Sequence, residues 1–303
     1  MRSPDDCGGR TAPRLSVVAM KVLTYNVKML PGIFGKGTQD LARAEQIATA
    51  LLARDDDVIA LQEVFDETVR RCLVHRLGGT FPHRIEKSGD DWFNEDSGLM
   101  LLSRLPFAAE PAFFEWDCKG PFWTSDRWAD KGVQLARLRL SDTAEVVLGN
   151  VHLQADYAPK SYADVRAGQV EQLARVVDRG LVHAPDPERV AAIVVGDFNI
   201  IAGSTEYDAM LQTLRGARDL WFDTHPDAPG YTVDRDVNTM VPENNQKRRI
   251  DLALAFDTVP GDGPDGPISL AAMKVTSIGV VRFKHEGKSL SDHDAVAVHV
   301  EVG

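Results

Sequence analysis

The sequence predicts a single α/β domain that contains mixed β-sheets. Short apolar segments rich in β-branched residues alternate with amphipathic segments along the whole chain, which is typical of strands and helices in one series. Two apolar segments within residues 132–154 are joined by Ser141 and Asp142, residue types that favour turns, so a hairpin is expected there. Hairpins and helical crossovers together require both antiparallel and parallel strands. No repeat or change of composition divides residues 20–303, so we expect one domain.

Each element follows from its own residue pattern. Residues 38–54 place apolar side chains at helical spacing behind Thr38, a candidate N-cap. A second helix is expected from about Ala163 to Asp178, and a third over residues 204–216, between the candidate cap Ser204 and Gly216. The expected strands are apolar runs bounded by polar or turn residues. They cover residues 21–27, 57–65, 97–106, the two halves of 132–154, the run that ends at Asp197, and residues 249–256, 274–283 and 295–302.

The first 19 residues differ from the rest because they mix charges, prolines and glycines. Their longest apolar run, Val17 to Met20, is far shorter than the core of a signal peptide. We therefore expect a flexible leader over residues 1–19. Because no signal peptide is recognisable, the expected location is cytoplasmic, with secretion left open. No stretch approaches the roughly 20 apolar residues of a membrane span.

Charge and cysteine content limit the function classes. The formal net charge is −11, so long-range electrostatics disfavour nucleic acid as a partner. Cys7, Cys72 and Cys118 lack CxxC spacing, which argues against a zinc cluster or a dense disulfide framework. The three cysteines therefore point to no site.

Polar side chains recur at the ends of the expected strands. Each one alone has an ordinary explanation, such as a turn, a helix cap, a buried structural histidine or a surface ion pair. Together they are carboxylates, amides and imidazoles, the groups that bind hard metal ions and phosphate and transfer protons. If the strands share a core, these ends converge on one cleft. The residues are Asn26, Glu63, His152, Gln154, Asp197, Asn199, Asp251, Asp292 and His293.

Six short motifs carry a family resemblance. "TYNV", "LQEV", "GNVHLQ", "GDFN", "RIDLALA" and "SDH" occur in that order between about residues 21 and 300. In this order they resemble the metal-dependent endonuclease/exonuclease/phosphatase superfamily that includes DNase I, and "LQEVFD", "SGLMLLSRLP" and "DKGVQLARL" are similar to its neutral sphingomyelinase C branch. The resemblance implies a four-layer α/β sandwich, in which two mixed sheets pack face to face between helices. It also implies a site at one end of the sandwich.

Phosphodiester hydrolysis needs a cation on the phosphate, an activated water and help for the leaving oxygen. Glu63 is the first candidate ligand for Mg²⁺, which prefers oxygen ligands, and Mn²⁺ or Co²⁺ are expected as substitutes. Asn26 is predicted to add its amide oxygen to the ion or to orient phosphate. The resemblance places Asp292 near the metal.

The catalytic roles are also what the resemblance implies. Asp197 positions or deprotonates the attacking water, and Asn199 donates to phosphate. Asp251 fixes the tautomer of His293 by accepting from one ring nitrogen. His152 flanks the phosphate on the other side, and either histidine could be the acid.

Two residues are predicted to bind substrate beside this set. Lys131 in "DKG" is predicted either to bind phosphate or to fix the loop that carries it, and both alternatives stay open. Gln154 belongs to the same strand end as His152, where Asp156 also follows.

The substrate is predicted less directly than the reaction. A sphingomyelinase-like monomer would hydrolyse a phospholipid, and an acidic protein suits a choline-type head group better than DNA. The alternatives are a soluble phosphomonoesterase of the inositol phosphate type and an endonuclease. The residues 275–290 that precede "SDH" have Phe283 as their one aromatic, whereas secreted bacterial sphingomyelinases resemble one another in an aromatic-tipped hairpin there.

A dense group of aromatic residues lies between the expected strands at residues 115–132. It is interpreted either as packing under a long loop or as a lid that faces lipid or a head group. Its members are Trp116, Phe122, Trp123 and Trp128.

Overall fold

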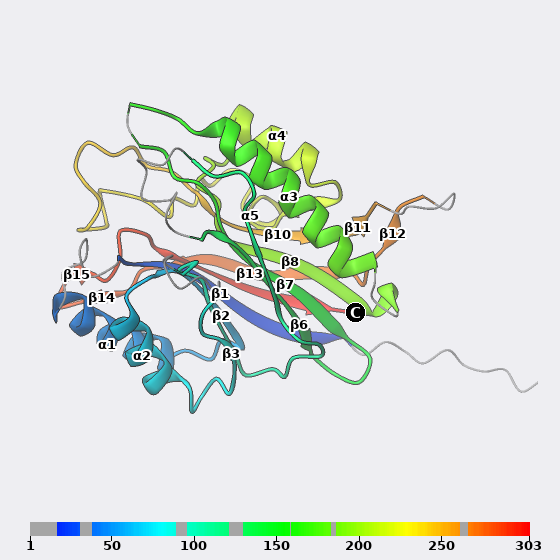
Figure 1. Ribbon diagram of the computed structural model, residues 1–303, viewed down its shortest axis with the longest axis horizontal. Helices are drawn as coiled ribbons and strands as arrows, with labels where there is room; N and C mark the ends of the chain where they lie inside the picture. The colour runs from blue at the N-terminus through cyan, green and yellow to red at the C-terminus, as the bar shows by residue number, and fades with distance from the viewer. Residues whose placement is uncertain are drawn as a thin grey trace, which may run out of the picture.

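Two six-stranded sheets pack face to face and are covered by helices on both outer sides (Figure 1). This arrangement, seen in a computed structural model, confirms the predicted four-layer α/β sandwich. The structure describes residues 17–30, 38–88, 96–120, 130–157, 159–182, 186–260 and 266–303. The expected leader lies outside these residues up to position 16, and Val18 and Ala19 already belong to the first strand.

The first sheet contains strands from both ends of the chain. β1 pairs in parallel with β2 and antiparallel with β16, so the last strand of the chain lies beside the first. In spatial order the strands are β13 (Met273–Val281), β16 (Ala295–Val302), β1 (Val18–Met29), β2 (Val58–Val64), β4 (Met100–Ser103) and β3 (His83–Ile85).

The second sheet comes from the middle of the chain. β6 and β7 form the predicted hairpin, and β7 then pairs in parallel with β8. In spatial order the strands are β5 (Ala112–Glu115), β6 (Gly132–Arg139), β7 (Glu145–His152), β8 (Val190–Asp197), β10 (Asp251–Phe256) and β9 (Ala217–Asp219). Two-stranded pairs join β11 (Thr258–Val259) to β12 (Ile268–Ser269) and β14 (Lys284–His285) to β15 (Lys288–Ser289).

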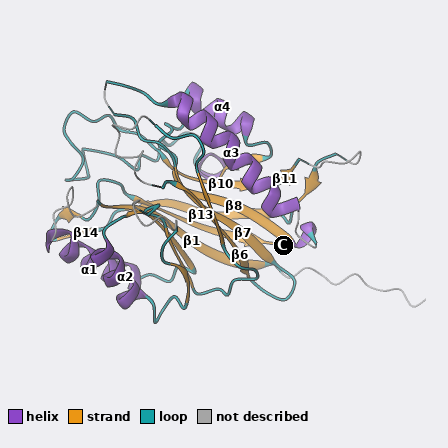
Figure 2. Cartoon of the chain, in the orientation of Figure 1, coloured by secondary structure: helices purple, strands orange, loops and turns teal. Residues whose placement is uncertain are grey.

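Alternation along the strands produces the layers, since successive side chains of a strand point to opposite faces. On β1, Val22 packs between the two sheets, while Leu23 packs outward under the helices. The outer face of the first sheet is covered by α1 (Thr38–Leu52) and α2 (Glu67–Leu77), and that of the second by α3 (Ala163–Val182) and α4 (Thr205–Thr213) (Figure 2). A short helix, α5 (Leu220–Thr224), and the 3₁₀ turn η2 (Pro187–Arg189) complete the fold.

Strand register brings the predicted polar residues to one end of the sandwich. His152 on β7 lies opposite Asp197 on the parallel strand β8, and Asp251 at the start of antiparallel β10 also lies opposite Asp197. In the first sheet, Asn26 on β1 lies opposite Gln62, next to Glu63. Both sheets therefore present their functional residues at the same end of the sandwich.

α2 was not predicted from the sequence. It begins after Asp66, whose side chain accepts from the backbone N–H groups of Thr68 and Val69, and it buries Val69, Leu73 and Leu77 at a spacing of four residues. The predicted cap Ser204 does open α4, where it accepts from the N–H of Tyr207. None of the described helices has the length and apolar character needed to cross a membrane.

Candidate active site

The carboxylate of Asp197 is the centre of the site. Its Oδ2 accepts from Asn26 Nδ2 at 3.0 Å and lies 3.6 Å from His152 Nε2 and 3.9 Å from His293 Nε2. Its Oδ1 accepts from the backbone N–H of Asn199 at 2.9 Å. Burial raises the pKa of Asp197 to about 6, against the opposing effect of His293. One carboxylate thus contacts residues from both sheets and from the segment before β16.

Glu63 lies beside Asp197 on the first sheet. Its Oε1 accepts from the Asn26 amide at 2.9 Å, and its side chain keeps 20% exposure, which leaves a route to solvent. Ligand atoms of Glu63, His152 and Asp197 lie within 4.8 Å of one another. Burial and the nearby charge of Asp292 raise the pKa of Glu63. This crowding of acidic groups is what a divalent cation would relieve, so the donor set fits such an ion.

The amide of Asn26 is oriented with its nitrogen toward the carboxylates. Nδ2 bridges Glu63 and Asp197, while Oδ1 accepts from the backbone N–H of Lys28 at 3.1 Å. Asn26 therefore holds the two carboxylates together in this arrangement. Its predicted role as an oxygen ligand, which would require the amide to turn, stays a prediction.

His293 and Asp251 form the predicted histidine–carboxylate pair. Asp251 Oδ2 lies 2.9 Å from His293 Nδ1, and the side chain of His293 is 11% exposed. Burial lowers the pKa of His293, but Asp251 and Asp197 outweigh this and hold it well above its usual value. Because Nδ1 is engaged with Asp251, Nε2 is the nitrogen that faces Asp197 and the cleft. Asp251 Oδ1 has no hydrogen-bond partner among the described residues.

His152 has the opposite environment. It is fully buried, and burial together with the positive charges of Lys131 and His293 holds its pKa well below the usual value. Lys131 Nζ lies 3.0 Å from His152 Nε2 and donates to the carbonyl of Leu153 at 3.2 Å. Lys131 is thus placed both to hold this loop and to bring positive charge to the cleft, the two alternatives that the sequence left open.

Trp116 belongs to the packing under His152. It is 1% exposed, and its Nε1 donates to the carbonyl of His152 at 3.0 Å. The interpretation of Trp116 as part of a lipid-facing lid is therefore wrong, because its ring is enclosed in the core of the second sheet. Phe122, Trp123 and Trp128 lie outside the described residues.

Three further predicted residues surround the cluster. Asn199 Nδ2 donates to the carbonyl of Leu153 at 3.1 Å, and the buried Gln154 donates from Nε2 to the carbonyl of Ala155 at 3.1 Å. Asp292 forms an ion pair with Lys28 at 2.5 Å. The structure therefore brings Asn26, Glu63, Lys131, His152, Asp197, Asn199, Asp251 and His293 into direct contact with one another or through one neighbour, and leaves Gln154 and Asp292 at the margin.

Strained backbone coincides with this site. Of the four described non-glycine residues with positive φ, three are Lys28 at 50°, Glu63 at 58° and Asn199 at 52°. The left-handed region is unfavourable for a side chain with a Cβ and is retained where the surroundings impose it, often at functional sites. Side-chain direction at the strand ends is thus fixed by backbone geometry that hydrophobic patterning does not reveal.

A buried polar network behind the site was also missed. Gln62 Nε2 donates to Asn150 Oδ1 at 2.8 Å and to Thr24 Oγ1 at 3.0 Å. Asn150 Nδ2 donates to the carbonyl of Leu61 at 3.1 Å and to Gln134 Oε1 at 3.2 Å. These bonds join the first sheet to the second directly below Glu63 and His152. The sequence did contain an indication of this network, because Gln62, Gln134 and Asn150 are polar residues inside otherwise apolar strands.

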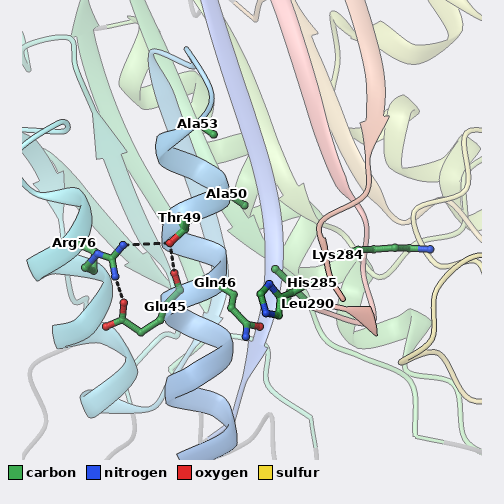
Figure 3. Close-up of a pocket in the computed structure, with 9 residues that line it drawn as sticks. All are labelled: Glu45, Gln46, Thr49, Ala50, Ala53, Arg76, Lys284, His285 and Leu290. Carbon is green, nitrogen blue, oxygen red and sulfur yellow. Dashed lines mark hydrogen bonds and ion pairs between the residues drawn. The ribbon is translucent and has the colours of Figure 1, made fainter. Parts of the chain in front are cut away.

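A separate hollow of about 380 Å³ lies between α1 and the β14–β15 pair (Figure 3). Arg76 there pairs with Glu45 and donates to Thr49, while Lys284 points away from α1. None of the predicted site residues lines it. We place the chemistry at the charged cluster, because reactivity requires convergent polar groups rather than volume.

The chain belongs to the Endonuclease/Exonuclease/phosphatase family, whose model matches residues 23–293. Within this family it is similar to a sphingomyelinase C of Bacillus cereus, with 26% identity over 244 residues that cover 73% of this chain and 68% of the relative. These findings confirm the resemblance that the six motifs indicated.

Solved structures show the same fold. The structure of SmcL superposes with a TM-score of 0.70 at 20% identity and covers 93% of this chain and 98% of that one. A structure of the beta toxin from Staphylococcus aureus, a double mutant with bound magnesium ions, gives a TM-score of 0.70 at 17% identity over 93% of this chain and 99% of that one. At these identities the likeness concerns the fold alone.

Proposed function

We propose that the protein is a divalent-metal-dependent phosphodiester hydrolase of the sphingomyelinase type. The observation that carries the proposal is the position of Asp197, which lies between Glu63 on one side and the His293–Asp251 pair on the other. Support for the sphingomyelinase type comes from the family and from the sphingomyelinase C relatives. All groups of the cluster come from one chain, which is consistent with activity as a monomer.

The residues present fit a divalent cation at Glu63. The partly exposed Glu63 carboxylate would hold the ion, with Asp197 next to it. When bound, the ion supplies positive charge to the phosphate oxygens. Magnesium is the proposed ion because the carboxylate donors are oxygens, and Mn²⁺ and Co²⁺ are proposed substitutes.

The chain's own groups can perform the remaining steps. Asp197 Oδ2, held by Asn26, is placed to accept a hydrogen bond from an attacking water. His293 has Nε2 directed at the same point and its other nitrogen fixed by Asp251, so it can move a proton there. Lys131 brings a buried positive charge close to His152 on the opposite side. The phosphate would thus lie between two imidazoles.

A choline-type phospholipid is the proposed substrate. The sphingomyelinase C relatives favour it, and the net charge of −11 favours a zwitterionic head group over a polyanion. Phe283, the one aromatic residue of the interval 275–290 before the "SDH" motif, packs against Tyr25 with ring centroids 5.2 Å apart. The β14–β15 turn carries Glu286 and Gly287 at its tip, both with positive φ, as in a tight hairpin.

A substrate panel tests this proposal. Sphingomyelin in detergent, an inositol phosphate and plasmid DNA are each incubated with Mg²⁺ or with chelator. We expect phosphocholine from sphingomyelin, lost on chelation and in Glu63→Gln, and unchanged in the control Glu110→Gln, an exposed carboxylate outside the site. Release of inorganic phosphate or nicked plasmid without phosphocholine would instead identify a phosphatase or a nuclease.

A further inference from the structure

Lys28 lies in a strained bulge of β1. The pairing of β1 with β2 shifts register between Asn26 and Met29, and Lys28 adopts a φ of 50°. Its backbone N–H donates to Asn26 Oδ1 at 3.1 Å, and its carbonyl accepts from Arg43 Nη2. A lysine gains nothing locally from left-handed backbone. The surrounding hydrogen bonds therefore impose this conformation. Its consequence is the direction in which the Lys28 side chain leaves the backbone.

Arg43 ties this bulge to a distant segment of the chain. Its Nη1 donates to the carbonyls of Val27 at 2.8 Å and Leu290 at 2.6 Å, and Nη2 pairs with Asp40 at 2.9 Å. Val27 precedes Lys28, and Leu290 lies two residues before Asp292. A single guanidinium thus fixes both the segment that carries Lys28 and the segment that carries Asp292, although 264 residues separate them.

The two side chains meet at the edge of the cleft. Lys28 Nζ lies 2.5 Å from Asp292 Oδ2, with 35% and 21% of the side chains exposed. The charge of Asp292 acts on Glu63, whose pKa it raises. Lys28 therefore neutralises a carboxylate that is electrostatically coupled to the candidate metal ligand.

We propose that the Lys28 ammonium takes the place of a second divalent cation at Asp292, so that this cleft binds one divalent ion, at Glu63. An ammonium paired with Asp292 neutralises the carboxylate and repels a second cation, which weakens the affinity of Asp292 for a metal ion. Asp197, Asp251 and His293 form a second group of potential ligands, but Asp197 accepts from Asn26 and Asn199, and Asp251 Oδ2 is paired with His293 Nδ1, so an ion there would have to replace these hydrogen bonds. The inference rests on the proposed function only for the ion at Glu63.

Counting bound Mn²⁺ tests the inference without reference to activity. Free Mn²⁺ is measured by electron paramagnetic resonance during titration of the full chain. We expect one ion per chain in the wild type and in Lys28→Arg, and two in Lys28→Met. Combining Lys28→Met with Asp292→Asn should return the number to one. The matched control is Lys288→Met, an exposed lysine on β15, which should bind one ion.

Each outcome decides the question. Two ions in the wild type, or one in Lys28→Met, would overturn the inference while leaving the proposed function standing. No ion in the wild type would overturn both. One bound ion without hydrolysis of sphingomyelin would contradict the proposed substrate alone. If circular dichroism shows that Lys28→Met is unfolded, Lys28→Gln is used in its place, with the same expected number of ions.

Discussion

At the scale of single residues, the site depends on a few fixed side-chain directions. Glu63 and Asn199 adopt left-handed backbone, and the Asn26 amide bridges Glu63 and Asp197. The residue types at these positions were predictable because carboxylate, amide and imidazole are the groups that phosphate chemistry requires. Their backbone angles and the Lys28–Asp292 pair were not, because both arise from contacts with segments far away in the sequence.

The His293–Asp251 pair gives the first prediction. Replacing His293 with Ala should lower kcat for phosphocholine release by about 10²–10⁴-fold, the usual contribution of a positioned acid or base. His285→Ala is the control, because His285 is exposed on β14. A loss below about fivefold, with the fold intact by circular dichroism, would remove His293 from the proposed chemistry.

Lys131 gives a second prediction at this scale. Lys131→Met removes the ammonium 3.0 Å from His152 Nε2 while keeping most of the side-chain volume. Loss of an interaction made with the reacting phosphate should lower kcat by about 10²-fold, as for other electrostatic stabilisers. Steady-state kinetics decide between the two interpretations of Lys131, because a lysine that merely fixes the loop would change thermal stability and leave kcat near the wild-type value.

At the scale of elements, strands were easier to predict than helices. The strands at residues 249–256, 274–283 and 295–302 match β10, β13 and β16 within two residues at each end. α2 was missed because its apolar stripe is narrow and lies among polar neighbours in the sequence, including Arg70, Arg71, His75 and Arg76. Arg70 is nevertheless buried, since it donates to the carbonyl of Val64 and pairs with Asp96. Such tertiary partners are invisible in a local pattern.

The Gln62–Asn150 network gives the prediction at this scale. Asn150→Leu removes the acceptor of one Gln62 Nε2 hydrogen bond and the donor to Gln134 Oε1, so buried polar atoms lose partners, which should cost about 2–4 kcal/mol in the free energy of unfolding. Thr24→Val removes one hydrogen bond to the same network and should cost about 1 kcal/mol. Urea denaturation measures both. Equal stability of Asn150→Leu and the wild type would show that this network does not hold the sheets together.

At the scale of the whole molecule, the two sheets supply different parts of one site. The first sheet carries Asn26 and Glu63, and the second carries His152, Asp197 and Asp251. Six separated motifs were enough to predict that these residues converge, because their order matched a known family. The substrate was predicted less closely than the reaction. The aromatic residues at 115–132 were a possible contact for lipid, but Trp116, the tryptophan in the described part of this segment, is buried.

Metal binding should therefore stabilise the assembled sandwich. Mg²⁺ at about 100 times its dissociation constant adds about 2.7 kcal/mol to the stability of the folded state, which corresponds to a Tm increase of roughly 5 °C for a domain of this size. Differential scanning calorimetry of the wild type, with chelator as reference, measures this shift. Glu63→Gln should show none, and NaCl of equal ionic strength controls for screening. An equal shift in the variant would place the stabilising ion elsewhere.

The most direct measurement is the anomalous scattering of Mn²⁺ in crystals of the wild-type protein. An anomalous peak is expected roughly 2.0–2.2 Å from a carboxylate oxygen of Glu63, the range for small divalent ions on oxygen ligands, with Asp292 still paired to Lys28. A crystal saturated with Mn²⁺ that shows no peak at Glu63 would contradict the metal-dependent hydrolase described above.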